Sequence, residues 1–535
     1  MLPVSRLCVR SSLRKLVFVR FVSCTSCGVT LQNNNVRGTG FYTPPKAQIE
    51  RKRPVIEDLK YLLFSQDLQS LKSELSAEER PKKNKPLICK RCNDALHHNT
   101  FSKEDFRRYS MQEVYRHVPA GADIYHVVPL TDFPLQLNSA VLKDSRYNSA
   151  LLLSKGDQVT PDKSLLQRKA PQFFKDMLRL KMNYNSNKSI AFSASKGWNI
   201  QSVYSVLRSN SFLIGCPNSG KSTLVNALLK KFPSLKPSEG NNASEAEIVR
   251  GAGVSNIPNM TRDLQSYNIG SKVINDLPGY STNYGSPGPE DALDAKVLEK
   301  IQKTHLFKKT KLVKQRYTSL KGTDAGRCYT VSGIFYLVPP PDTINQVVNY
   351  IPGNERQYRN IDKALSVVNS EHACPEKGPL RQYVGVQKAM ESKDNYVRHV
   401  LPPFQGSIEV VLKEIGYFQL KTTGKYKFLG LHEVWVPKGV DVCIREPIAR
   451  LIDEGYEGYL SSEGKKKAIP EKREVFSATY PMSFEETDTL QKMKEMFLER
   501  TKNDVLARKF ISSNPLKIIG TAQKEAPNLY WYYKW

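Results

Sequence analysis

The sequence of 535 residues lacks any apolar run that approaches the ~18 residues needed to cross a bilayer as a helix, so we expect no transmembrane segment. A single domain is also excluded, because domains usually contain about 100 to 200 residues. Hydrophobic residues make up 40% of the chain and aromatic residues 10%, which is enough for several packed cores. The chain is therefore expected to fold as a multidomain protein.

Acidic residues are missing from the start of the chain. The first is Glu50, whereas Arg6, Arg10 and Arg14 recur every four positions. In a helix these arginines lie on one face, and they interrupt the apolar stretch that a secretory signal would need. We predict a mitochondrial presequence over residues 1–22 and a location in the mitochondrial matrix, with a basic RNA-binding arm as the alternative.

Acidic residues are also scarce in the chain as a whole. The sequence has 80 Lys and Arg against 52 Asp and Glu, a net charge of +28 at pH 7. This charge favours a polyanionic partner, because cationic side chains that neutralise phosphates release counterions. We expect ribosomal RNA as the partner; the alternative is that the charge reflects only the basic composition common among mitochondrial and ribosome-associated proteins.

Cysteine is sparse, at nine residues, but two Cys-x-x-Cys pairs occur, Cys24 with Cys27 and Cys89 with Cys92. Two thiolates three positions apart can face one ion, and two such pairs complete a tetrahedral zinc site. Disulfides are the alternative, although a reducing matrix disfavours them. We predict a zinc module with a charged insert over residues 23–115.

Beyond the cysteine pairs, apolar segments alternate with helical patterns, as in an α/β sheet. The segments 150–153, 189–192 and 212–214 each end at a motif of nucleotide-binding type. Ligands bind at the carboxyl ends of the strands in such sheets. We predict a nucleotide-binding α/β domain over residues 116–305 and a separate α+β domain over residues 306–535.

The strongest of these motifs is Gly215-x-x-x-x-Gly220-Lys221-Ser222, which follows an apolar strand and opens a helical segment. Its glycines let backbone N–H groups approach phosphates. Lys221 is expected to pair with the β and γ oxygens, and the Ser222 hydroxyl to ligate Mg²⁺. The nucleotide contacts expected from this loop are Gly215, Pro217, Asn218, Ser219, Gly220, Lys221, Ser222 and Thr223.

An Asp-x-x-Gly motif, Asp276 to Gly279, lies downstream of the phosphate loop. We expect Asp276 to hold the Mg²⁺ shell and the Gly279 N–H to sense the γ-phosphate. Thr261 is the candidate switch threonine and a candidate Mg²⁺ ligand. An isolated Asp-x-x-Gly is a common turn, but its place after the phosphate loop favours the GTPase interpretation.

The glutamine that orients the attacking water in small GTPases is missing, because Tyr280 follows Gly279. Asn218 occupies the phosphate-loop position at which potassium-activated GTPases hold a monovalent cation, whose charge can replace an arginine finger. We predict slow intrinsic hydrolysis that K⁺ stimulates and Na⁺ does not. The alternative is that Asn218 only shapes the loop.

Base choice is expected to depend on Asp157, whose carboxylate can accept both N1–H and N2–H of guanine, while Lys155 covers the ring and the Ala194 N–H reaches O6. Ser154 stands where Asn is usual and has a single donor. We therefore expect guanine selectivity with modest affinity, so that GTP binds more tightly than ATP. The expected base-site residues are Ser154, Lys155, Asp157, Ser193, Ala194 and Lys196.

The base-reading motifs precede the phosphate loop, although an ordinary GTPase has the opposite order. This inversion predicts a circularly permuted G domain. The chain then leaves the Asp-x-x-Gly motif through the basic stretch 308–314 toward the C-terminal domain, which ordering of the switches could move. That stretch and the lysines at 465–467 are candidate phosphate contacts, with solvated loops as the alternative.

These features resemble the YqeH family of circularly permuted GTPases. The resemblance covers residues 24–450, and the presequence and insert are similar to its fungal mitochondrial branch, the genetic interactors of prohibitins. It implies a zinc module, a permuted G domain, a C-terminal domain that contacts the switches, and a role in small ribosomal subunit assembly. The segments that carry it are Cys24-Thr25-Ser26-Cys27-Gly28-Val29, Gly40-Phe41-Tyr42-Thr43-Pro44-Pro45 and Cys89-Lys90-Arg91-Cys92.

The leading hypothesis is a mitochondrial GTPase that uses GTP, Mg²⁺ and Zn²⁺, with K⁺ as an activator, and acts on the small mitochondrial ribosomal subunit or its RNA. The branch name points instead to prohibitins and inner-membrane lipid homeostasis. A GTP-binding scaffold with negligible turnover is the third hypothesis, favoured if Lys221→Ala leaves function intact. No oligomeric state follows from the sequence.

Overall fold

The computed structural model describes residues 23–43, 87–95, 108–185, 189–233, 252, 261–281, 287–303, 318–373, 386, 392–401, 404, 407–423, 431–470 and 475–482. The expected presequence, the charged insert (46–86) and the basic stretch 308–314 lie outside these residues. The chain forms two compact units, Met1–Phe101 and Ser102–Trp535, and each is described by itself.

The described part of the first unit consists of two short segments, 23–43 and 87–95, joined by backbone hydrogen bonds. Gln32 pairs with Phe41 within the first segment. The second segment contains the short helix α3 (Lys90–Asn93), whose first N–H donates to the Phe41 carbonyl at 2.6 Å. This bond brings the two Cys-x-x-Cys pairs into one small fold, although 61 residues separate them in the sequence (89 − 27 − 1).

The second unit begins with α4 (Met111–Tyr115) and a six-stranded sheet in the order β3-β2-β1-β4-β6-β5. Its strands run parallel except β5, which pairs antiparallel with β6. The three apolar segments named above overlap β2, β3 and β4, as the sequence predicts. The strand bounds are β1 (Asp123–Pro129), β2 (Asn148–Ser154), β3 (Ser189–Ala191), β4 (Asn210–Ile214), β5 (Gln265–Ile269) and β6 (Lys272–Asp276).

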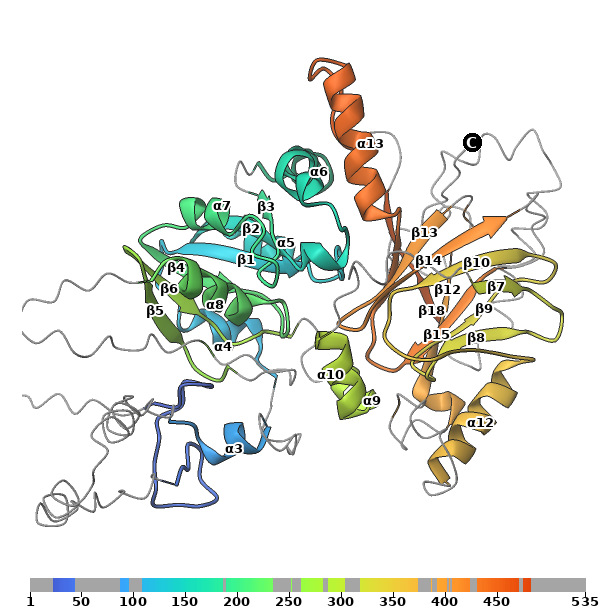
Figure 1. The fold of residues 1–535 in the computed structure, drawn as a ribbon, viewed down its shortest axis with the longest axis horizontal. Coiled ribbons are helices and arrows are strands. Elements are labelled where there is room, and N and C mark those ends of the chain that lie inside the picture. The colour runs from blue at the N-terminus through green and yellow to red at the C-terminus, as the bar shows by residue number, and fades with distance from the viewer. Residues whose placement is uncertain are drawn as a thin grey trace, which may run out of the picture. The chain divides into compact units, whose positions relative to one another are not determined.

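Helices cover both faces of this sheet (Figure 1). Because side chains alternate along a strand, Val127 and Leu152 pack with α7 and α8, whereas Val128 and Leu151 pack with α6. Burial on both faces explains why these strands are almost continuously apolar. The helices are α5 (Ser139–Lys143), η3 (Gly156–Gln158), η4 (Leu165–Lys169), α6 (Ala170–Met182), α7 (Ile200–Val206) and α8 (Lys221–Lys231).

The C-terminal region contains two antiparallel six-stranded sheets, called here the first sheet (β17-β16-β13-β14-β10-β7) and the second sheet (β11-β8-β9-β15-β12-β18). The first is built from β7 (Thr318–Lys321), β10 (Ile344–Asn349), β13 (Ser407–Leu412), β14 (Gly416–Thr423), β16 (Val442–Arg445) and β17 (Phe476–Ala478). The second is built from β8 (Cys328–Val331), β9 (Tyr336–Val338), β11 (Glu355–Tyr358), β12 (Tyr396–Val400), β15 (Glu433–Pro437) and β18 (Tyr480–Met482).

One hydrophobic core joins the two sheets, with Val410 and Phe418 from the first and Leu337 and Val434 from the second. Leu298 also belongs to this core, which therefore reaches back before residue 306, the predicted start of the C-terminal domain. No helix of the described segments is both long and apolar enough to cross a membrane. The helices here are α9 (Pro289–Ala292), α10 (Ala295–Lys303), α12 (Ile361–Ala373), η7 (Lys393–Asn395) and α13 (Ile448–Ser461).

Helix α13 packs on α6 of the α/β region (Figure 1). Ile448, Leu451 and Ile452 share a buried core with Phe173 and Phe174. The α/β region and the C-terminal region therefore share a hydrophobic core within the second unit. The reason is that the apolar face of α13 is buried against a helix distant in the sequence, a contact that local patterns do not reveal.

Candidate nucleotide-binding site and cysteine cluster

The predicted nucleotide motifs meet at one edge of the α/β sheet, because each follows the carboxyl end of a parallel strand. Ser154 is the last residue of β2, the phosphate loop (215–222) follows β4, and Asp276 is the last residue of β6. The strand register aligns them, with Leu213 opposite Asp276. This edge is where ligands bind in open α/β sheets.

The phosphate loop has the backbone shape that its sequence predicts. Gly220 has a φ of 95° and directly precedes α8, a conformation that side chains rarely tolerate. Gly215 has no room for a Cβ, which would collide with the Val127 carbonyl. Asn218 has a φ of 56°, a left-handed conformation that Asn tolerates better than most residues, so it does shape the loop.

The side chain of Lys221 is enclosed by the backbone of this loop. Its Nζ donates to the carbonyls of Gly215 and Cys216, each at 3.0 Å, and the side chain is buried. Burial lowers the pKa of Lys221, while Asp276 and Cys216 act in the opposite direction. An ammonium held among carbonyls at the start of a helix is placed to exchange these bonds for phosphate oxygens.

Ser222 and Asp276 form a pair of oxygen donors next to Lys221. The Ser222 hydroxyl donates to Asp276 Oδ2 at 2.5 Å, and Asp276 Oδ1 has no hydrogen-bond partner in the described segments. Burial raises the pKa of Asp276, although Lys221 and Ser222 oppose this. Hard oxygen ligands at a phosphate loop fit Mg²⁺. Thr261, the candidate switch threonine, is buried just before β5.

The Asp-x-x-Gly motif contacts the phosphate loop directly. A Cβ on Gly279 would lie 2.7 Å from the Pro217 backbone nitrogen, so only glycine fits there. The next residue, Tyr280, is fully buried with Cys216 and Leu277. Its ring therefore lies in the core, which agrees with the inference that it does not orient an attacking water.

The residues predicted to read the base converge on Asp157, which is 6% exposed. Its carboxylate accepts hydrogen bonds from Ser193 Oγ at 2.6 Å and from Ser195 Oγ at 2.9 Å. The Lys196 N–H donates to Ser193 Oγ at 3.1 Å, and Ala194 lies in the same turn. Sequence reasoning missed Ser195 as a site residue; the available signal was a second hydroxyl two positions after Ser193.

Ser154 connects the predicted base-reading segment (154–158) to the phosphate loop. Its hydroxyl donates to the Ser219 carbonyl at 2.5 Å. The single donor of this serine, at the position where Asn is usual, makes the contact. Lys155 follows with a φ of 56°. Burial lowers the pKa of Lys155, and the carboxylates of Asp132, Glu414 and Asp157 oppose this shift.

Glu414 is a further residue that sequence reasoning did not assign to the site. It lies in the turn between β13 and β14, and its N–H donates to Asp132 Oδ2 at 2.9 Å. Burial and the nearby Glu290 raise the pKa of Glu414 to about 8. The two bonded residues are 282 positions apart, so only the folded chain reveals the contact.

The four cysteines of the first unit form one buried cluster. Their sulfur atoms all lie within 4.8 Å of one another, and none is in a disulfide. Cys27 Sγ and Cys89 Sγ are 3.9 Å apart, close to the ~3.8 Å that tetrahedral geometry with Zn–S distances of about 2.3 Å requires. The Cys89 N–H donates to Cys24 Sγ at 3.3 Å, a contact that favours a thiolate. These residues fit a zinc ion.

A parallel sheet that carries a phosphate loop, a Ser–Asp pair suited to Mg²⁺ and a buried base-reading carboxylate at one edge defines a P-loop GTPase domain. Comparison with known families agrees. The family described as 50S ribosome-binding GTPase matches residues 210–320. The N-terminal and C-terminal domains of Genetic interactor of prohibitins 3 match residues 23–106 and 315–521.

Full-length relatives agree as well. The protein named Genetic interactor of prohibitins 3, mitochondrial, from Zygosaccharomyces rouxii is 46% identical over 536 residues, which cover 96% of this chain and 94% of the relative. The protein of the same name from Saccharomyces cerevisiae strain S288c is 42% identical, with 96% of each chain covered. The chain belongs to the Genetic interactor of prohibitins 3 family of mitochondrial proteins.

Proposed function

We propose that this chain is a circularly permuted GTPase of the mitochondrial matrix that acts in assembly of the small mitochondrial ribosomal subunit, through rRNA or ribosomal-protein contacts. The observation that carries the GTPase part is the convergence of Lys221, Asp276 and Asp157 at one sheet edge. Asp157 precedes Lys221 in the chain, which is the reverse of the order in an ordinary GTPase. Both residues nevertheless follow strands of the same sheet, and this arrangement supports the permutation.

In this proposal the phosphate loop and Lys221 bind the β- and γ-phosphates, and Asp157 reads guanine. Ser222, Asp276 and Thr261 would hold Mg²⁺, which when bound neutralises charge on the transferred phosphoryl group. Because Tyr280 is buried, it does not take the place of the missing glutamine, and we expect intrinsic hydrolysis to be slow. Stimulation by K⁺ at Asn218 remains part of the proposal, and equal rates in K⁺ and Na⁺ would contradict it.

The ribosomal part is supported by charge and by the cysteine cluster. The net charge of +28 favours RNA, and Lys465 and Lys466 are exposed in the C-terminal region. A Cys₄ zinc module adds a second candidate RNA-binding surface. The family description that matches residues 210–320 refers to 50S particles for its own members, so the experiment must distinguish the two subunits.

The test is comigration with ribosomal particles in sucrose gradients of mitochondrial lysate, with a non-hydrolysable GTP analogue or with GDP. We expect nucleotide-dependent comigration with the small subunit or its precursors. Lys221→Ala should lose the dependence on nucleotide, because the phosphate contact is removed. Comigration with the large subunit alone, or with neither subunit in either state, would contradict the proposal.

A second candidate function follows from the name of the relatives, which refers to a genetic interaction with prohibitins. Under this alternative the chain acts in inner-membrane lipid homeostasis. The two functions predict opposite orders of events after depletion. A ribosomal role predicts loss of small-subunit rRNA before any change in lipid composition, and the membrane role predicts the reverse. A nucleotide-binding scaffold would instead tolerate loss of hydrolysis.

A further inference from the structure

The first sheet of the C-terminal region has an outer face that is buried rather than solvated. Along each strand, alternate side chains point to opposite faces, so Val410, Phe418 and Ile444 enter the core between the sheets. Their neighbours Glu409, Tyr417 and Arg445 therefore share the other face, and all three are buried. This outer face (Glu409, Tyr417 and Arg445) contacts the α/β region.

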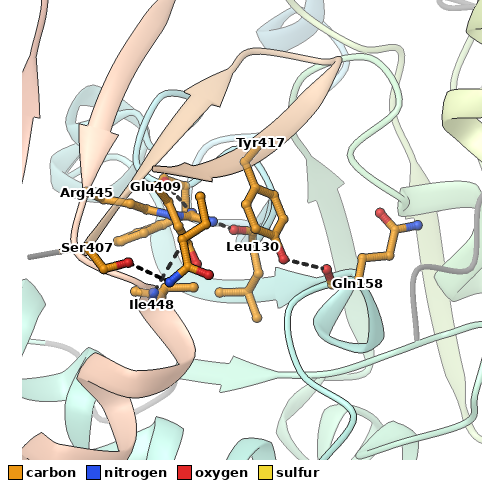
Figure 2. Close-up of polar contacts among 9 residues, drawn as sticks. Leu130, Gln158, Ser407, Glu409, Tyr417, Arg445 and Ile448 are labelled. Atoms are coloured by element: carbon orange, nitrogen blue, oxygen red, sulfur yellow. Dashed lines mark hydrogen bonds and ion pairs between the residues drawn. The ribbon is translucent and has the colours of Figure 1, made fainter. Parts of the chain in front are cut away.

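Arg445 makes the most extensive of these contacts (Figure 2). The guanidinium is fully buried and pairs with Glu409 Oε2 at 2.7 Å. Its Nη1 donates to the carbonyls of Leu130 at 2.8 Å and Phe133 at 2.5 Å, in the loop that follows β1. A buried guanidinium needs such acceptors, because an unpaired charge in the interior is costly. The contact therefore holds the loop after β1 against the first sheet.

Tyr417 continues this contact to the base-reading segment (154–158). Its hydroxyl donates to the Gln158 carbonyl at 3.0 Å, immediately after Asp157, as Figure 2 shows. The loop after β1 reaches the other end of the segment, because the Leu130 N–H donates to the Ser154 carbonyl at 2.9 Å. One end of the segment is thus hydrogen-bonded directly to the C-terminal region, and the other end is connected to it through Leu130.

The conformation of the base-reading segment is restricted, and these hydrogen bonds help to hold it. Lys155 has a left-handed backbone conformation, and Gly156 leaves no room for a Cβ next to Leu166. The carboxylate of Asp157 must meet two adjacent N–H groups of guanine, which requires a well-defined position. A hydrogen bond to the next carbonyl restricts how far Asp157 can move.

We propose that Tyr417 is a positioning residue for guanine: the C-terminal region holds the base-reading segment in its guanine-binding geometry through this tyrosine, so that base affinity depends on the docked C-terminal region. This inference rests on the proposed GTP binding. It differs from coupling through the switches, because the route runs to the base and not to the γ-phosphate. Coupling is reciprocal, so guanine nucleotides also stabilise the docked state.

The test uses the full chain and compares GDP with IDP, whose base lacks the 2-amino group that Asp157 reads. Tyr417→Phe removes only the hydroxyl that donates to Gln158. We expect GDP affinity to fall about fivefold, the effect of one hydrogen bond of about 1 kcal/mol, and the GDP-to-IDP affinity ratio to fall with it. Loss of stability alone would lower the melting temperature without changing this ratio.

Tyr329→Phe is the matched control. Tyr329 is fully buried in the core between the two sheets, and its hydroxyl has no hydrogen-bond partner in the described segments. We expect wild-type GDP affinity and base ratio. An unchanged ratio in Tyr417→Phe would overturn the inference. A wild-type chain that binds neither GDP nor GTP would instead overturn the GTP-binding proposal and this inference with it.

A second measurement needs no variant. The Glu414 amide donates to Asp132 across the contact, whereas the Lys413 amide donates to the Asp441 carbonyl within the C-terminal region. We expect GDP to slow hydrogen exchange at Glu414 and to leave exchange at Lys413 unchanged. Equal exchange at Glu414 with and without GDP would overturn the inference.

Discussion

At the scale of single residues, the proposed guanine site is centred on one buried carboxylate. Asp157 is 6% exposed and accepts hydrogen bonds from Ser193 and Ser195. These hydroxyls orient the carboxylate, and each of its oxygens retains a lone pair for guanine. Hydrogen bonds to a charged acceptor contribute about 1.5 to 3 kcal/mol each. Base selectivity should therefore be lost when this acceptor is changed.

Asp157→Asn should weaken the binding of guanine nucleotides. The amide places a donor where guanine requires an acceptor, so GDP should bind at least about 100-fold more weakly. XDP should gain affinity, because the xanthine O2 accepts a hydrogen bond. Isothermal titration calorimetry with both nucleotides measures the exchange. Asp162→Asn changes an exposed aspartate nearby and should leave GDP binding intact. Unchanged GDP affinity in Asp157→Asn would show that Asp157 does not read the base.

At the scale of elements, the hairpin of β13 and β14 places an acidic side chain in a half-buried position. Glu414 lies at its turn with a φ of 64°. Burial and Glu290 raise the pKa of Glu414 to about 8, with Asp132 adding to the effect and Lys413 and Arg108 opposing it. The folded chain therefore holds a proton on Glu414 in a pH range where the unfolded chain has lost it.

This shift predicts a pH dependence of stability. Because the pKa of Glu414 is higher in the folded chain, its contribution to stability falls as pH rises from about 4.5 to about 8 and then levels off. Glu414→Gln should reduce the fall in melting temperature across that window. Glu463→Gln, an exposed glutamate that also has positive φ, should follow wild type. Parallel curves for wild type and Glu414→Gln would contradict the prediction.

At the scale of the whole molecule, the chain has two compact units with different sources of stability. The second unit has large hydrophobic cores, one of which joins α6 to α13. The described part of the first unit has few buried side chains apart from its four cysteines. Small modules of this kind usually owe their folding free energy to a bound metal.

Cys92→Ser should therefore lower the zinc content from about one ion per chain toward zero and unfold the first unit, because three ligands bind zinc less tightly than four. GDP affinity should stay within about twofold of wild type, since the residues of the proposed nucleotide site all belong to the second unit. Zinc release followed by a chelating dye, together with GDP titration, provides both readouts. The control is Cys328→Ala, which removes a buried free cysteine of the second unit. This variant should keep the wild-type zinc content. Full zinc content in Cys92→Ser would exclude the cluster as the site.

Much of the site follows from local sequence patterns. Glycine spacing around Lys221 predicts a loop because few residues tolerate its backbone angles, and two Cys-x-x-Cys pairs predict a metal cluster because thiolates three apart can share an ion. Apolar segments that end at motifs predict parallel strands with a common edge. The structure brings Ser222 to Asp276 and Asp157 to Ser193, as this reasoning requires.

The sequence by itself therefore determined the class of chemistry, because local backbone and ligand requirements are written in short motifs. Only the tertiary structure decided how the C-terminal region meets the base-reading segment. The bonds of Tyr417 to Gln158 and of Arg445 to Leu130 join residues 259 and 315 positions apart. Such contacts depend on which face of a sheet is buried and on which element covers that face. The packing of the whole chain determines both, because no periodic sequence pattern specifies the covering element.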